Sequence, residues 1–504
     1  MGDTNSVKAQ LWGRMKEFTP LVAFGTFYTS IAMFNYGYDV GVFSGLQAME
    51  PFEKRFGTCT PQGKCALPSY LSSIMNSTPF LGKLIGCWLG VPIAERLGRK
   101  KAMLIIALVS LVAVSLQISA TTAAQFTVGR ILAFGMTGIC VISIPAYMAE
   151  IAPPSLRGLI SSQLQIQIVF SQLVASGINY GTANIPNNNS WRIPVLIQFV
   201  MPVFLLTLLP ILVESPRWLI SRGRQEDAMQ ALQKLRKKDT SVESLQLEID
   251  MLSSFKENEE KGSWREVFQG TNRRRTFIVT IAMIGQQITG QSFASQYSTI
   301  FYTQQGFTNA FALSLISTAV SFAGVLISGF FVDGLGRRPL LIGGGLSQAF
   351  WLFLLGGMGT IADPTQAQKH TLVASLMLFG VSYGLSWASL SYVILAEAAS
   401  RRVVEKTNML AISLSVVTAF VVSFTVPYLV NDGYAGLGAR VGFVYGALAL
   451  LMAALAWLFV PEMKGLELEQ LDRLFEARTP TRSFGKVELE RLGGEQDKVG
   501  AEQL

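Results

Sequence analysis

A run of 57 residues without a charged side chain, from Thr276 to Val332, constrains this chain more than any other feature. A second long stretch, from Ala102 to Ala149, contains only one charge, Arg130. Soluble proteins average about 25% charged residues, whereas this chain has 15%. A soluble domain cannot carry such stretches, but a helical membrane protein requires them, because the hydrocarbon core excludes charge. We therefore expect an all-α membrane protein.

The lengths of the apolar stretches predict how often the chain crosses the membrane. A helix needs about 20 residues to span about 30 Å of hydrocarbon. The sequence contains twelve stretches of that size, at 21–45, 70–93, 102–120, 125–148, 160–183, 193–213, 276–304, 309–332, 339–361, 371–396, 408–430 and 439–460. The first is too long and too polar for the apolar region of a signal peptide, so we predict no signal peptide.

The basic residues indicate the orientation of these spans. With both termini on one side, that side receives 33 of the 41 lysines and arginines, the other side receives six, and Lys83 and Arg130 fall within spans. The positive-inside rule then places both termini and the central loop in the cytoplasm. Because topology explains the net charge of +8, we expect no nucleic-acid partner.

The segment between the sixth and seventh spans is the soluble-looking part of the chain. From Ser215 to Arg275 it holds 23 charged residues in 61, and its apolar spacing predicts short amphipathic helices at the membrane surface. We divide the chain into a cytoplasmic N-terminus, a six-helix half, this amphipathic linker, a second six-helix half and a cytoplasmic tail, at 1–20, 21–213, 214–275, 276–460 and 461–504. This is the outline of the major facilitator fold, with two pseudo-symmetric halves of six transmembrane helices.

One short motif recurs after the second and the eighth spans. Each copy has an acid, a glycine three residues later and then basic residues: Glu95, Arg96, Gly98 and Arg99 in one, and Asp333, Gly336, Arg337 and Arg338 in the other. The acid can pair with nearby bases and with a helix N-terminus, which would lock the cytoplasmic ends of the helices together in one conformation. Simple anchoring of helix ends is the alternative, and two copies at equivalent places favour the lock.

Six motifs in order resemble the sugar porters of the major facilitator superfamily, over about residues 25–476. They are GYDVG with Ser44 and Gly45, Gly129 with Arg130, PAYMAEIAP with Arg157, ESPRWL, Gln286 and Gln287 with Gly290, and PEMKG. The resemblance adds further residues to the predicted gating motifs: Glu150, Arg157, Glu214, Arg217, Glu397 and Glu462. RRRT before the seventh span, YST within it and Gly442–Phe443 look most like the fungal α-glucoside (maltose-type) permease branch.

Polar and aromatic residues inside spans are the candidates for contact with a solute, since amides suit sugar hydroxyls and pyranose faces stack on rings. The resemblance places a sugar contact at Gln165, and Gln172, seven residues later, shares its helical face. The full set of candidates is Gln165, Gln172, Gln286, Gln287, Ser292, Tyr297, Trp387 and Tyr392. For each of them, packing within the bundle is the alternative role.

Several positions depart from the family pattern on the expected substrate side. Ser292 stands where an asparagine is usual, and the tenth span lacks the usual prolines and has Tyr392 in place of a tryptophan. In the eleventh span the usual asparagines and tryptophan are Ser415, Val416 and Ala419. We expect a secondary transporter of a sugar, either a hexose or an α-glucoside such as maltose. The alternative is a carrier on the same fold that imports or exports a fungal secondary metabolite or another non-sugar solute.

Other classes of function have less support. The chain has no P-loop for ATP-driven transport, and its single His370 has no ligand-spaced partner, so we expect neither an enzyme nor a metal or other cofactor. A channel and a sugar sensor without transport are weaker alternatives. We expect a multi-pass plasma-membrane protein that functions as a monomer.

Asp39 in the first span and Arg130 in the fourth are the predicted proton-coupling residues. Each alone costs about 2.5–3.5 kcal/mol in a membrane helix, so pairing across the bundle is economical. The resemblance implies proton symport, because proton-coupled sugar porters carry an acid and an arginine at these places. A helix movement that separates the two would change the proton affinity of Asp39. A permanent structural ion pair is the alternative.

Two modifications are predicted on the external side. Cys59 and Cys65 flank a short segment with Pro61 and Gly63, and a turn there would bring them within disulfide distance in an oxidising environment. Asn188 begins a glycosylation sequon in the loop between the fifth and sixth spans.

Overall fold

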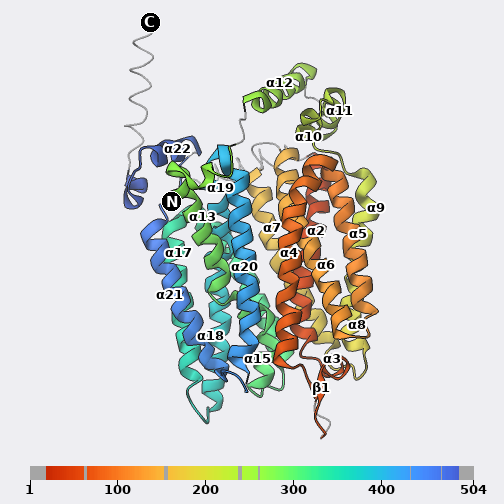
Figure 1. Ribbon diagram of the computed structural model, residues 1–504, viewed down its shortest axis with the longest axis vertical. Helices are drawn as coiled ribbons and strands as arrows, with labels where there is room; N and C mark the ends of the chain where they lie inside the picture. Colours follow the sequence, from red (N-terminus) through yellow and green to blue (C-terminus); the bar gives the residue numbers. More distant parts are fainter. Residues whose placement is uncertain are drawn as a thin grey trace, which may run out of the picture.

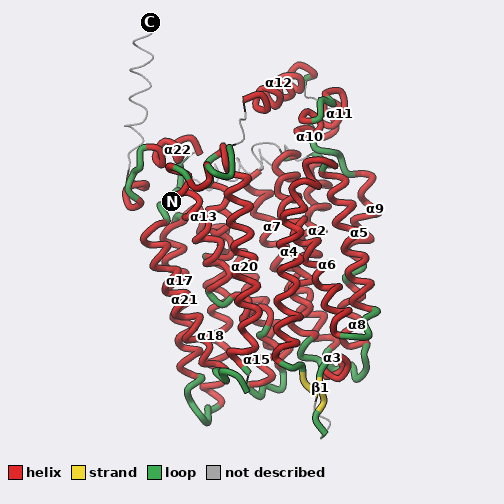
Figure 2. Tube along the Cα trace, viewed as in Figure 1, coloured by secondary structure: helices red, strands yellow, loops and turns green. Residues whose placement is uncertain are grey.

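The computed structural model consists of long helices packed side by side, with short helices gathered at one end of the bundle (Figures 1 and 2). It describes residues 19–61, 65–152, 157–236, 241–258, 262–431, 433–466 and 468–486. Within these ranges, the side chains of 157–164, 254–258, 330–333, 468–469 and 485–486 lie outside the description.

The first half of the bundle contains six helical spans, the last of which is interrupted. They are α2 (Pro20–Leu46), α4 (Ser69–Leu97), α5 (Arg99–Ile118), α6 (Ala123–Ile151), α7 (Arg157–Thr182), and α8 (Asn189–Ile197) followed by α9 (Val200–Leu208) and a 3-10 turn (Leu209–Ile211). A short helix and a two-stranded antiparallel hairpin follow α2: α3 (Glu50–Phe56), β1 (Thr58–Cys59) and β2 (Cys65–Ala66).

The second half repeats this order, with breaks in its first and fourth spans. They are α13 (Gly270–Ile288) with α14 (Gln291–Gln296) and α15 (Ser298–Gln304), α16 (Ala310–Leu335), α17 (Arg337–Met358), α18 (Gln366–Leu385) with α19 (Trp387–Glu397), α20 (Val404–Val430) and α21 (Val441–Phe459). Gly290, in the left-handed region at φ 97°, separates α13 from α14, and Ser386 separates α18 from α19.

All twelve predicted stretches are helical in the structure, which confirms the all-α class. In the described part of the chain, eight helices are long and apolar enough to cross a membrane: Arg99–Ile118, Ala123–Ile151, Asn189–Ile211, Ala310–Gly329, Arg337–Met358, Gln366–Glu397, Arg401–Val430 and Gly438–Phe459. The other four predicted spans form α2, α4, α7 and the broken α13–α15, which carry the buried polar residues discussed below.

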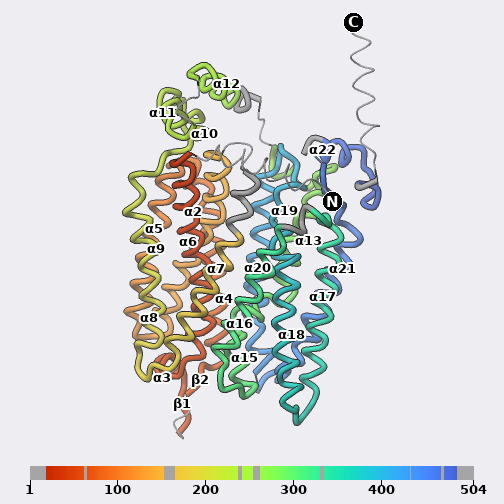
Figure 3. The backbone as a smooth tube through the Cα atoms, turned by 180° about the vertical axis from the view of Figure 1, so that it is seen from behind, coloured from red at the N-terminus to blue at the C-terminus, as the bar shows by residue number. Residues whose placement is uncertain are grey.

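The helix contacts follow a two-fold pattern. In the first half α2 packs on α7 and α6 packs on α4 and α5, and in the second half α13 packs on α20 and α18 packs on α16 and α17. The two halves meet along two equivalent seams, α4 against α20 and α7 against α16, and the second seam is visible from behind (Figure 3). The same sequence order thus builds two equivalent bundles that enclose a space between them.

Glycines bring α4 and α6 together in the most extensive helix interface of the described chain. A Cβ atom added to Gly82 would meet the carbonyl oxygen of Ile131, and one added to Gly86 would meet the carbonyl oxygen of Gly135. Small residues spaced four apart allow such close approach of helix backbones in membranes.

The segment between the halves forms three short helices at one end of the bundle: α10 (Pro216–Ser221), α11 (Gln225–Leu235) and α12 (Val242–Asn258) (Figure 1). Their apolar side chains form a small core of their own, made of Leu219, Ile220, Ala228, Ala231, Leu232, Leu245 and Ile249. The hydroxyl group of Thr19 donates to the carbonyl of Leu235 at 2.9 Å, which ties α11 to the start of α2. A 3-10 turn (Glu266–Phe268) leads into α13, and α22 (Leu468–Glu476) and a last turn (Thr481–Lys486) lie at the same end.

The opposite end of the bundle carries the hairpin. Cys59 and Cys65 face each other across its two strands and are joined by a disulfide. Asn188 is the residue before α8 and is half-buried, and its side-chain oxygen accepts a hydrogen bond from the Trp191 indole at 3.3 Å.

Candidate functional site

A cavity of about 150 Å³ lies between the two halves, and helices of both contribute to its wall. Six of the eight predicted solute contacts line it: Gln165, Gln172, Gln286, Gln287, Ser292 and Tyr392. Hydroxyl groups cover much of the remaining wall, among them those of Ser295, Ser314, Ser317, Thr318 and Ser321. The cavity therefore offers many hydrogen-bond donors and acceptors in the middle of a bundle that is otherwise apolar.

The glutamines of the cavity differ in how they are held. Gln286 donates to the carbonyl oxygen of Ala388 at 3.0 Å, and Gln287 donates to the side-chain oxygen of Gln286 at 3.1 Å. Gln165 and Gln172 line the cavity from α7 and have no hydrogen bond within the described part of the chain. Their amides, each with donors and an acceptor, are free to bind a polar solute.

The structure does not place Trp387 and Tyr297 in this cavity, which corrects two of the predictions. The Trp387 indole is fully buried against Gly285 and Gly345, and its N–H donates to the carbonyl of Leu341 at 3.1 Å. The two glycines leave the volume that the indole fills. The hydroxyl of Tyr297 donates to the carbonyl of Ser423 at 3.2 Å, and its ring lines a separate, smaller cavity.

Lys83 is a charged cavity residue that the sequence analysis did not assign to solute binding. It lies in the middle of α4, its side chain is 9% exposed, and its Nζ lies 2.8 Å from the hydroxyl oxygen of Tyr36. The signal in the sequence was a lone lysine inside a span, which is unusual because such a charge is costly there. Tyr36 and Tyr383 also line the cavity and were not predicted.

Asp39 and Arg130 are both buried but are not in direct contact, contrary to the expected pairing. Neither carboxylate oxygen of Asp39 has a hydrogen-bond partner, and none of the ion pairs among the described residues joins it to Arg130. Arg130 donates from Nε to the carbonyl of Met75 at 3.3 Å, and its guanidinium carbon lies 3.8 Å from the centre of the Phe43 ring. The aromatic face and the backbone carbonyl take the place of the carboxylate.

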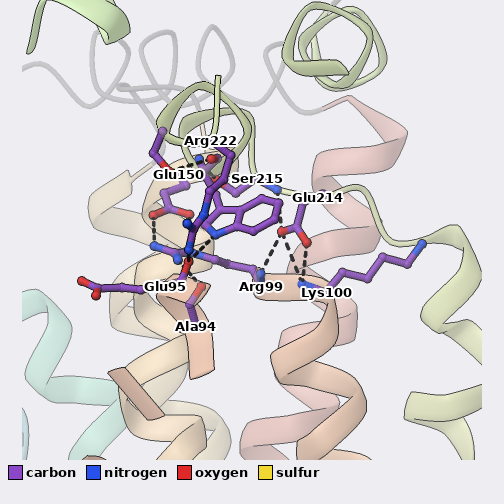
Figure 4. A network of polar contacts seen from close by, with 10 residues as sticks. Ala94, Glu95, Arg99, Lys100, Glu150, Glu214, Ser215 and Arg222 are labelled. Atoms are coloured by element: carbon purple, nitrogen blue, oxygen red, sulfur yellow. Dashed lines mark hydrogen bonds and ion pairs between the residues drawn. The ribbon is translucent and has the colours of Figure 1, made fainter. Parts of the chain in front are cut away.

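The motif after α4 forms a polar cluster at the end of the bundle that carries the linker helices (Figure 4). The Arg99 guanidinium binds both oxygens of Glu150, at 2.9 and 2.6 Å. The backbone N–H groups of Arg99 and Lys100 donate to the carboxylate of Glu214, at 2.9 and 3.2 Å. Glu214 therefore caps the N-terminus of α5, where a helix presents unpaired N–H groups and partial positive charge.

The motif after α16 forms the same cluster in the second half. Arg337 binds both oxygens of Glu397, at 3.2 and 2.9 Å. The backbone N–H groups of Arg337 and Arg338 donate to Glu462, at 2.9 and 3.1 Å, so that Glu462 caps α17. Equivalent acids from distant segments thus bind equivalent helix starts in the two halves.

Other residues of the predicted gating motifs do not take part in these two clusters in the same way. The side chains of Arg157 and Asp333 lie outside the described residues. Glu95 contributes its backbone carbonyl, which accepts from the Trp218 indole and from Arg222, both at 2.7 Å, while Arg96 and Arg217 are exposed.

A further ion pair lies near the start of α13, where Glu266 pairs with Arg402 at 2.8 Å. The Ser263 backbone N–H, which donates to Glu266, and the Arg402 guanidinium hold the pKa of the Glu266 carboxyl below its usual value.

Gly98→Ala should disrupt the first cluster. Gly98 has φ 94° and ψ 165°, a conformation that costs other residues about 1–3 kcal/mol, and a Cβ atom there would lie 2.5 Å from a carboxylate oxygen of Glu214. We expect a lower apparent Tm of the purified protein and slower transport. Gly223→Ala is the control, because Gly223 also has positive φ, at 74°, but a Cβ atom there would meet no atom within 4 Å. Equal effects of the two changes would show that the Glu214 contact is unimportant.

The opposite end of the bundle is closed by hydrogen bonds between the halves. Gln47 donates to the carbonyl of Gln296 at 2.7 Å, and Ser73 donates to the carbonyl of Phe424 at 2.9 Å. Asn431 donates to the hydroxyl of Ser69, also at 2.9 Å. These three bonds join the two halves at the hairpin end in this conformation.

Two equivalent six-helix halves around a central polar cavity define a carrier of the major facilitator type, not an enzyme. The sequence profile described as "Sugar (and other) transporter" matches residues 25–475. The chain belongs to this family of multi-pass membrane transporters, as the motifs predicted.

Curated relatives and solved structures agree with this assignment. The chain is 28% identical to hexose transporter HXT10 of Saccharomyces cerevisiae, over 93% of this chain and 86% of the relative. It is also 28% identical to the major facilitator-type transporter ecdD of Aspergillus rugulosus, over 93% of this chain and 90% of the relative. Its fold matches the proton:xylose symporter XylE bound to 6-bromo-6-deoxy-D-glucose, with a TM-score of 0.73, 25% identity, and coverage of 90% of this chain and 99% of the other.

Proposed function

We propose that this protein is a secondary active transporter that carries a small polar solute, a hexose or an α-glucoside, together with a proton. The observation that carries the proposal is the central cavity, in which the amides of Gln165 and Gln172 have no hydrogen bond to any other described residue. The similarity to a hexose transporter, HXT10, supports the choice of solute. The motifs that resemble those of α-glucoside permeases are the reason why the proposal includes a disaccharide such as maltose.

Alternating access is the mechanism that the contacts support. The hairpin end is sealed by hydrogen bonds between the halves, whereas the clusters around Glu214 and Glu462 each hold helices within one half. A rocking movement of the two halves would break the hydrogen bonds between them at the hairpin end. The contacts of each cluster lie within one half, so this movement does not have to break them. Each helix start that is capped by a glutamate then moves together with its own half as a rigid unit.

Proton coupling is proposed at Asp39. Its carboxyl group is buried on α2, and Arg130 is near enough to interact electrostatically without forming an ion pair. A carboxyl group in this situation can gain and lose a proton as the distance to the arginine changes during transport. Protonation of Asp39 would release α2 from Arg130 and favour the solute-binding state, so that one proton enters with each solute.

The proposed setting is the plasma membrane, with the protein acting as a monomer. The basic residues place the linker helices and both termini in the cytoplasm. The hairpin with Cys59 and Cys65 then lies outside, where a disulfide is stable.

A non-sugar solute is the second candidate. Ser415, Val416 and Ala419 line the cavity with small side chains where sugar porters usually carry larger amide and indole groups. The similarity to ecdD, a major facilitator-type transporter without a sugar in its name, fits this alternative. Such a carrier would either import or export its solute.

Uptake of labelled solutes by transporter-deficient yeast cells tests the proposal. Hexoses, maltose and other α-glucosides are offered singly to cells with and without the protein at the plasma membrane. Saturable uptake of any of them supports the sugar permease. Absence of uptake for the whole panel, with a metabolite that accumulates inside cells of the source organism when the gene is deleted, supports the exporter.

Gln172→Ala should weaken solute binding without loss of folded protein. Because this amide makes no hydrogen bond in the described chain, its removal costs the fold little but takes away a solute contact, and we expect about tenfold weaker apparent affinity. Gln117→Ala is the control, since Gln117 is buried in α5 away from the cavity. Unchanged KM in Gln172→Ala would remove this glutamine from the site.

A further inference from the structure

The cavity wall contains a positive charge that no described residue of the cavity balances. Lys83 is the only charged side chain among the described residues that line the cavity. The groups that interact with it electrostatically are the phenol groups of Tyr36 and Tyr392 and the thiol of Cys87, and none of them is a carboxylate. A buried ammonium group normally has an anionic partner, because desolvation of an unpaired charge is costly.

The ammonium group of Lys83 also has unused hydrogen-bonding capacity. It carries three N–H donors, of which the structure uses one, on the hydroxyl oxygen of Tyr36. The Tyr36 ring centre lies 4.8 Å from Nζ, so the tyrosine supports the head group from one side. Lys83 lines the cavity, which is the space that a solute would occupy. The two remaining N–H donors are therefore available to a solute.

We infer that the cavity accepts a polyhydroxylated solute that carries one carboxylate, and that Lys83 binds this carboxylate. This inference rests on the proposed transport function and narrows its substrate class from sugars to sugar acids and similar hydroxy acids. The glutamines and hydroxyl groups of the wall bind the hydroxyl groups, as they would for a neutral sugar. A single lysine balances a single negative charge, whereas a phosphate ester would bring a charge of about −1.5 to −2.

The alternative is that Lys83 only fastens α4 to α2 through Tyr36. In that case the charge on the lysine would matter for stability but not for the choice between a neutral and an acidic solute. The two roles therefore differ in a measurable property, the ratio of affinities for two solutes that differ only in charge.

D-glucuronate and D-glucose are such a pair, since a carboxylate replaces the hydroxymethyl group. Binding of each to the purified full-length protein at pH 7 is measured by intrinsic tryptophan fluorescence and by the shift in apparent Tm. We expect wild type to bind glucuronate at least about tenfold more tightly than glucose, as a charge-assisted hydrogen bond would give.

Substitutions assign the preference to Lys83. Lys83→Met should abolish the preference for glucuronate while glucose still binds, and Lys83→Arg, which keeps the charge, should retain it. Lys54→Met is the control, because Lys54 is exposed on α3 and pairs with Glu50. Should Lys83→Met fail to fold, the ratio of affinities of wild type for the two solutes remains decisive.

The outcomes separate this inference from the proposed function. Binding of glucose without any preference for glucuronate, or a preference that persists in Lys83→Met, would overturn the inference and leave the sugar transporter intact. Binding of glucuronate alone, lost in Lys83→Met, would support the inference and exclude glucose as the solute. Binding of neither compound would overturn both the inference and the sugar proposal.

Discussion

Asp39→Asn should abolish accumulation of solute against a gradient while exchange of solute down its gradient persists. The substitution removes the group that gains and loses the proton but keeps the size and polarity of a side chain that is 2% exposed. Wild type should accumulate solute more strongly at pH 5 than at pH 7.5, because the inward proton gradient is larger, and the mutant should show no difference. The measurement is uptake of a labelled solute at both pH values, with and without a protonophore.

Asp363→Asn is the matched control for this experiment, because Asp363 is exposed in the loop between α17 and α18. It should accumulate solute as wild type does. If Asp39→Asn still concentrates the solute in a pH-dependent way, the coupling site lies elsewhere in the chain.

Gly86→Val should cause a large loss of stability. The backbone of α6 lies against Gly86, and any Cβ atom there would collide with the carbonyl oxygen of Gly135. A backbone oxygen cannot move aside as a flexible side chain can, so the cost should reach or exceed the upper end of the about 1–3 kcal/mol typical of overpacked cores. The fraction of monodisperse protein after detergent extraction and the apparent Tm measure this effect.

Gly343→Val provides the comparison. Gly343 is exposed on α17, and a Cβ atom there would meet no atom within 4 Å. This variant should keep the Tm of wild type within a few degrees. Equal behaviour of the two variants would mean that the α4–α6 interface tolerates separation, contrary to the close packing seen here.

Hydrophobicity and charge alone predicted the positions of the helices, because both are properties of local segments. The pairing of Gln165 with Gln172 on the cavity wall was also predictable, since residues seven apart share a face in any regular helix. The side chain of Trp387 was not predictable in this way. It follows the break at Ser386, where helical periodicity no longer fixes direction, and its indole fills the space beside two glycines from other helices.

Contacts between segments far apart in the chain account for the other differences between the predicted site and the observed site. The sequence indicated that Asp39 and Arg130 should attract each other, but it did not show that the Phe43 ring would lie beneath the guanidinium. The roles of Glu214 and Glu462 as caps of distant helices likewise depend on how the segments after α9 and α21 turn back over the bundle. Lys83 was visible as a charge inside a span, but only the three-dimensional structure shows that it faces the cavity beside Tyr36.

Counterflow in liposomes tests most directly the claim that the central cavity carries solute by alternating access. Purified protein is reconstituted into vesicles filled with a high concentration of unlabelled solute, chosen from those that bind, and diluted into a trace of the same labelled solute. A carrier should concentrate the label transiently inside the vesicles above its outside concentration, and Gln172→Ala should shift this effect to higher solute concentration. A rise of label that only approaches the outside concentration, without an overshoot for any bound solute, would contradict the account and indicate a channel.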